Sequence, residues 1–93
     1  MLDPRQLQAL SAVAAEGSLA RAASRLGWSQ PTVDYHLRAL DRLVGSPLLV
    51  RSTRGSTLTA AGRLLLERGT EILSLSERAL TDAREFAQVG RAR

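Results

Sequence analysis

The sequence predicts a mainly α-helical fold in which three short helices and a small two-stranded hairpin precede one long C-terminal helix. Three observations lead to this prediction. Glycines and capping residues divide the first part of the chain into three helical segments. Two short β-type segments then flank a turn at residues 52–56. Finally, apolar and small residues continue at three-four spacing for about three heptads beyond residue 65.

The first helix is predicted to run from Pro4 to about Glu16. Asp3 is a favourable N-cap, Pro4 suits the first helical position, and Gln6 can complete a capping box. Gly17 is expected to end the helix. The residues predicted to share its buried face are Leu7, Leu10, Val13 and Ala14.

The next two helices form a closely spaced pair. Ser18 is expected to cap a helix that Gly27 ends, and Ser29 is expected to cap a helix that continues to about Val44. The buried positions of the later helix are predicted to be Val33, Leu37, Leu40 and Val44. Trp28 lies in the turn, where we expect it to act as a buried anchor. Two helices joined by a short turn containing Gly are typical of a helix-turn-helix.

A small hairpin is predicted after the helix pair. Its strands are expected at residues 48–51 and 57–59, with Arg51 at a strand end and Arg54 in the turn. Because an isolated two-stranded hairpin is at best marginally stable, it must pack on the helices. The prediction is therefore a winged helix-turn-helix. A solvated loop carrying unrelated charges is the alternative for this segment.

The long helix is predicted from Ala60 to about Gln88, with Thr59 as its cap. Its apolar stripe is longer than a small three-helix core can cover, which predicts a homodimer formed through this helix. The alternative is a helix folded back on its own domain. The predicted interface residues are Leu65, Gly69, Ile72, Leu73, Ser76, Ala79, Leu80, Ala83 and Phe86. We therefore expect a DNA-binding domain at 1–59, a linker and dimerisation helix at 60–89, and a frayed tail at 90–93.

Charge is unevenly distributed along the 93 residues, whose net charge is +4. The segment 1–66 has eight Arg and four acidic residues, whereas the five Arg of 67–93 are balanced by five acidic residues. All the excess positive charge therefore lies in the part that contains the helix pair and the hairpin. Such a distribution favours a nucleic-acid partner.

Several other function classes receive no support. The chain has no Cys and one His, His36, so we predict neither disulfides nor a metal site nor any other cofactor. His36 has no nucleophile or phosphate-binding loop to accompany it, and it is expected to be an exposed helix residue. The sequence has no apolar run of about 18 residues and no secretory signal, so we expect a cytoplasmic protein that is not an enzyme.

Several motifs together resemble one known family. They are Ala22-Ala23, the Ser29-Gln30-Pro31 start of the third helix, and Leu58-Thr59 followed three residues later by Gly62. The carrying segments are 7–17, 17–26, 29–33, 37–45, 47–51 and 58–62. Nearly the whole chain, from Leu2 to Phe86, resembles the N-terminal domain of LysR-type transcriptional regulators. The 30–37 run is also similar to ArsR-type repressors, but the absence of Cys argues against their usual metal sensing.

The LysR resemblance implies a sequence-specific regulator that binds double-stranded DNA as a homodimer. Helix 29–44 would enter the major groove, and wing 48–59 would lie on the backbone or minor groove. Asp34 and Tyr35 fall where the family more often has Ser and Arg. Asp can accept a hydrogen bond from cytosine, and Tyr can contact a thymine methyl or a phosphate. The alternative for Asp34 is that it only pairs with Arg38, at i and i+4 on the helix surface. The expected DNA-binding residues are Ser29, Gln30, Pro31, Thr32, Asp34, Tyr35, Arg38, Arg42, Arg51 and Arg54. Such regulators normally bind small-molecule effectors in a further domain. Because this sequence resembles only the N-terminal domain, no small-molecule pocket is expected in it.

A second function class remains open. A winged helix can also serve as a protein-interaction module that binds another regulator rather than DNA. Asp34 favours this alternative because a carboxylate on the recognition helix weakens phosphate binding. The four Arg at positions 38, 42, 51 and 54 favour DNA.

Overall fold

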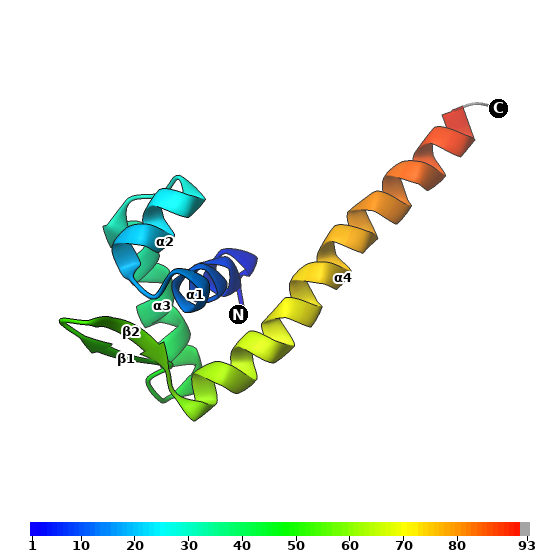
Figure 1. Ribbon diagram of the computed structural model, residues 1–93. Helices are drawn as coiled ribbons and strands as arrows, with labels where there is room; N and C mark the ends of the chain where they lie inside the picture. Colours follow the sequence, from blue (N-terminus) through cyan, green and yellow to red (C-terminus); the bar gives the residue numbers. More distant parts are fainter. Residues whose placement is uncertain (92–93) are drawn as a thin grey trace.

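The computed structural model describes residues 1–91 as a small helical domain from which one helix projects (Figure 1). Its elements are α1 (Pro4–Glu16), α2 (Leu19–Leu26), α3 (Gln30–Val44), β1 (Leu49–Ser52), β2 (Gly55–Leu58) and α4 (Ala60–Arg91). The predicted mainly α-helical fold with a hairpin and a long last helix is confirmed. The molecule measures 59 × 26 × 19 Å, the longest dimension reflecting the projection of α4.

The predicted helix starts are present in detail. Asp3 accepts a hydrogen bond from the Arg5 amide, and the Gln6 side chain accepts one from the Asp3 amide at 2.9 Å, which completes a capping box. Ser18 caps α2 and Ser29 caps α3 through their hydroxyls. Because these contacts satisfy amides that a helix start leaves unpaired, local sequence is sufficient to set where each helix begins.

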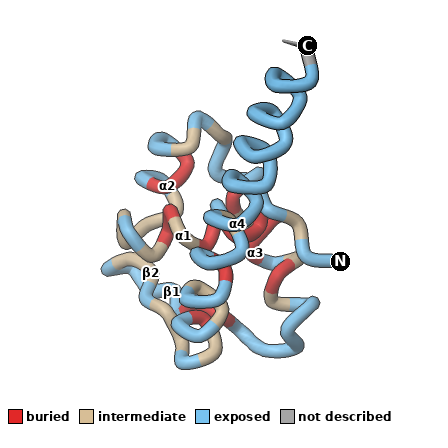
Figure 2. Tube along the Cα trace, turned by 90° about the vertical axis from the view of Figure 1, so that its right-hand side faces the viewer, coloured by how far each residue is buried: buried red, intermediate tan, exposed pale blue. Residues whose placement is uncertain are grey.

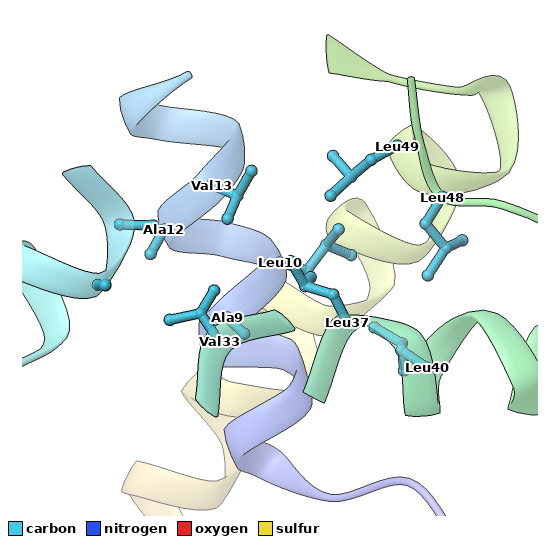
Figure 3. Packing of buried hydrophobic residues seen from close by; sticks show 11 residues of the cluster. Ala9, Leu10, Ala12, Val13, Val33, Leu37, Leu40, Leu48 and Leu49 are labelled. Atoms are coloured by element: carbon cyan, nitrogen blue, oxygen red, sulfur yellow. The ribbon is translucent and has the colours of Figure 1, made fainter. Parts of the chain in front are cut away.

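The core forms where α1, α2 and α3 meet the start of the hairpin (Figure 3). Its fully buried side chains include Leu10 and Val13 of α1, and Leu37 of α3. Ala22 and Ala23 of α2 are buried as well, and their small size permits close helix packing. Trp28 is half-buried against this cluster, as expected for an anchor in the turn.

Two predictions about α3 are wrong. His36 is 7% exposed rather than a surface residue. It lies three residues after Val33 and four before Leu40, on the core-facing side, and its ring is 5.6 Å from that of Trp28 between centroids. Val44 is 44% exposed rather than buried, because α3 ends at this point and the chain returns to the core only with Leu48.

The hairpin is tighter than predicted. The strands pair antiparallel from Leu49 opposite Leu58 to Ser52 opposite Gly55, which leaves only residues 53–54 in the loop. The predicted strand bounds, 48–51 and 57–59, are therefore wrong by one to two residues. Thr59 lies after β2 instead; its hydroxyl accepts from the Gly62 amide at 3.1 Å and caps α4 as expected.

Only the first part of α4 packs on the domain. Gly62 and Gly69 are buried, and a Cβ at Gly69 would lie 2.9 Å from a methyl of Leu7 in α1. Every residue from Ser74 to Gly90 is exposed (Figure 2). The helix continues through Arg91, beyond the predicted end at 89, and residues 92–93 of the predicted tail lie outside the described residues. The alternative in which this helix folds back on its own domain is not what the structure shows.

Candidate nucleic-acid interface

The N-terminal half of α3 presents an exposed polar face. Gln30, Pro31 and Thr32 in its first turn are exposed, and Tyr35 is 65% exposed one turn later. The Ser29 hydroxyl is engaged within the helix start, as expected for a cap. It accepts a hydrogen bond from the Thr32 amide at 3.2 Å and lies 2.9 Å from the Thr32 hydroxyl. Side chains of this kind on the first turns of a recognition helix can reach base edges in a major groove.

Asp34 joins this helix to the hairpin. One oxygen, Oδ2, accepts a hydrogen bond from Nε of Arg38 at 2.8 Å, and the other, Oδ1, accepts one from Nη1 of Arg51 in β1. The Arg38 guanidinium, and then Arg51, hold the pKa of Asp34 below its ordinary value although partial burial opposes this. The pKa of Arg38 is correspondingly raised by its hydrogen bond with Asp34.

This ion-paired cluster borders an open hollow of about 500 Å³. Its lining comes from α2, α3 and β1, and comprises Leu19, Gln30, Pro31, Asp34 and Arg51. Four of these five residues were predicted to contact DNA, and folding brings them together from separate segments. Leu19, which is half-buried and packs against the core, is the one member that was not among the predicted DNA contacts.

The other predicted basic contacts lie on either side of this cluster. Arg42 is exposed in the last turn of α3, and Arg54 is exposed at the hairpin tip. Within residues 1–91, neither forms an ion pair. Their guanidinium groups are therefore available to phosphate, for which Arg has a matching donor geometry.

The hairpin is held against the helices by its backbone. The Ser56 amide donates a hydrogen bond to the Gly17 carbonyl at 2.9 Å, and the Leu48 amide, at the base of the hairpin, donates one to Oδ1 of Asp41 in α3 at 3.0 Å. The wing therefore has a defined position relative to α3. This arrangement places Arg51 beside α3 and leaves the tip of the hairpin projecting (Figure 1). Arg54 lies in the loop at this tip.

The predicted interface residues of α4 divide into two groups. Gly69 is buried against Leu7 of the same chain, and Leu65 and Leu73 are half-buried. The others are exposed, and they are Ile72, Ser76, Ala79, Leu80, Ala83 and Phe86. Sequence reasoning missed Leu75 and Val89, which are 64% and 59% exposed. Together with Ile72, Ala79 and Phe86, these two residues lie at three-four spacing on one face of α4. This spacing would have indicated both of them from the sequence.

Residues 1–91 contain no group of three or more side chains suited to binding a metal ion. No helix in the same range is long and apolar enough to span a membrane.

Residues 4–63 match the family described as bacterial regulatory helix-turn-helix protein, lysR family. The chain belongs to this family. The match includes all three core helices, the hairpin and the start of α4. The family is one of transcriptional regulators rather than of enzymes.

The relatives similar to this LysR-family chain are longer than it is. It is 42% identical over 87 residues to the HTH-type transcriptional regulator BudR of Klebsiella aerogenes, covering 94% of this chain and 61% of BudR. It is 39% identical over 92 residues to the small neutral protease regulatory protein of Streptomyces coelicolor, covering 99% of this chain and 28% of that protein. The chain thus spans less than two thirds of either relative.

A solved structure shows the same fold. The crystal structure of the CbnR DBD–DNA complex superposes with a TM-score of 0.88 at 43% identity, covering 92% of this chain and 99% of that one. The LysR-family chain therefore has the winged-helix architecture that its sequence predicts.

Proposed function

We propose that this chain is the DNA-binding and dimerisation part of a transcriptional regulator, acting on double-stranded DNA as a homodimer. Residues 1–59 form the DNA-binding unit, and residues 60–89 form the linker that pairs two copies. The main support is the exposed first half of α3 beside a wing that carries Arg51 and Arg54. The similarity to CbnR, whose structure is a complex with DNA, supports the same function.

In this proposal α3 enters the major groove and the wing lies along the backbone or minor groove. Gln30 can form a bidentate hydrogen bond with adenine through its amide, and Tyr35 can contact a thymine methyl or a phosphate. Arg42 and Arg54 contact phosphates and supply affinity rather than sequence preference. The remaining predicted contacts are Ser29, Pro31, Thr32, Asp34, Arg38 and Arg51. In this proposal the protein works in the cytoplasm and acts by binding rather than by catalysis.

Dimerisation follows from the exposed apolar side chains of α4. Ile72, Leu75, Leu80 and Phe86 are 43%, 64%, 55% and 83% exposed, and an apolar stripe of this length favours a partner helix. A second copy of the chain offers the same stripe, so the two faces are complementary by symmetry.

A gel-shift experiment with genomic DNA fragments tests the DNA-binding function. We expect a subset of fragments to be retarded in excess competitor DNA, with an affinity that falls steeply as salt rises, because phosphate contacts release counterions. A protein that retards no fragment at low salt would instead be a protein-interaction module. Capture of a second regulator, with no DNA binding, would favour that alternative.

A further inference from the structure

Asp34 is the only acidic residue in an otherwise basic or neutral set of predicted DNA contacts. Asp34 lies on α3 and accepts hydrogen bonds from two arginines. One is Arg51, seventeen residues away in β1, and the other is Arg38, one turn along the same helix. The three side chains are 31%, 29% and 62% exposed. The cluster is therefore a surface feature that DNA can reach.

Both carboxylate oxygens of Asp34 are occupied by arginine donors. Oδ2 receives Nε of Arg38 at 2.8 Å, and Oδ1 receives Nη1 of Arg51. The two non-bridging oxygens of a DNA phosphate would accept hydrogen bonds from these guanidinium groups in the same way. In the free protein the carboxylate thus satisfies donors that a phosphate would otherwise take.

We propose that Asp34 is a positioning residue that acts through Arg38 and Arg51 as an internal counter-ion in place of a DNA phosphate. The inference rests on the proposed DNA-binding function and deepens it. A duplex phosphate must either displace the carboxylate or bind the remaining N–H donors of the two arginines against its negative charge. This cost falls on every sequence, so Asp34 lowers the affinity for DNA regardless of the contacts that Gln30 and Tyr35 make to base edges at a particular site.

The physical consequence is a lower affinity for DNA of arbitrary sequence. Sequence-independent binding depends mainly on counterions released by cationic side chains. With Asp34 present, Arg38, Arg51 and the carboxylate contribute a net charge of +1 rather than +2.

The test is binding of Asp34→Asn to a labelled 30-base-pair duplex of scrambled sequence, at salt concentrations from about 50 to 200 mM. We expect the slope of log affinity against log salt to be steeper than wild type by about one to two units, because one or two more phosphates are neutralised. At about 0.1 M salt, the affinity should rise by roughly fivefold or more. Glu85→Gln removes the same charge from the far part of α4 and should leave the slope unchanged.

A second arm tests the arginine. If Asp34 restrains Arg51, the Arg51→Gln change should weaken scrambled-duplex binding more in the Asp34→Asn background than in wild type. Equal losses in the two backgrounds would overturn the proposal. Asp34→Ser, which introduces the residue more frequent in the family, provides a second neutral variant, and circular dichroism melting checks that each variant is folded.

The outcomes separate this inference from the proposed function. If the wild-type chain binds no DNA at low salt, the proposed function fails and the inference fails with it. If it binds but Asp34→Asn has the wild-type slope or a shallower one, only the inference is overturned. Loss of cytosine preference at one position in a binding-site selection, with an unchanged slope, would identify Asp34 as a base-reading residue instead.

Discussion

The amide of Ser56 donates a hydrogen bond to the carbonyl of Gly17 at 2.9 Å, and this contact joins the wing to the turn between α1 and α2. The adjoining residue, Gly55, has a φ of 126°. A Cβ at Gly55 would lie 2.5 Å from the same Gly17 oxygen. The position of the wing therefore depends on a residue without a side chain.

The first prediction concerns this contact. Gly55→Ala should lower the free energy of unfolding by about 1–3 kcal/mol, because the backbone conformation is strained for Ala and the added methyl displaces the Gly17 carbonyl. Gly27→Ala is the matched control, since Gly27 also has a positive φ but has open space around it. Chemical denaturation compares them, and an equal loss in both variants would show that the close approach to Gly17 contributes nothing.

The second prediction concerns the tip of the wing. Arg54→Ala should weaken binding to all DNA sequences alike and lower the salt slope by about one unit, because one phosphate contact is lost. Arg84→Ala, on the exposed part of α4, removes the same charge and should leave the slope as it is. Titrations by fluorescence anisotropy give the slopes. A changed sequence preference with an unchanged slope would contradict a backbone role for Arg54.

The third prediction concerns dimerisation. Replacing Ile72 and Ala79 with Asp should convert the protein to a monomer, because two carboxylates would be placed in the apolar stripe of α4. Ser74→Asp with Thr81→Asp adds the same charges at the same spacing on the opposite face and should remain dimeric. Light scattering at several concentrations measures the mass. Dimers in both double variants would place the interface elsewhere.

The fourth prediction is a dependence of stability on pH. The pKa of Asp34 is lowered in the folded protein, chiefly by its hydrogen bond with Arg38. Its bridge therefore stabilises the fold above the ordinary Asp pKa, and this contribution is lost as pH falls through that value toward the lower folded-state pKa. Between about pH 5 and 2 the stability of Asp34→Asn should fall less steeply than that of wild type. Parallel curves from urea denaturation would show that the bridge is not formed in solution.

The features predicted correctly from sequence are those that depend on neighbouring residues. Asp3 with Gln6, Ser18, Ser29 and Thr59 cap their helices through contacts within a few residues. The Asp34–Arg38 pair, at i and i+4, could also be anticipated as an alternative to base reading. Short-range spacing alone is enough for such contacts.

The features missed depend on contacts between distant segments. The bond from Arg51 to Asp34 requires the hairpin to lie beside α3, and no spacing in the sequence indicates it. His36 was expected at the surface because its polarity outweighed its position between Val33 and Leu40. Gly69 was expected in the dimer interface because small residues recur along α4. In the structure it is instead buried against Leu7 of the same chain. In each case tertiary packing decided what the local pattern left open.

The exposed stretch of α4 has a consequence for folding. From Ser74 to Gly90 no residue is buried, so this part of the helix gains nothing from the domain core. Isolated helices of about this length are marginal in water, because nucleation is costly and only packing offsets it. The helical fraction of this segment should therefore rise with the concentration of the partner that packs on it, by mass action. In dilute solution residues 74–90 should therefore unfold before the domain core, so folding of this segment and assembly become a single equilibrium.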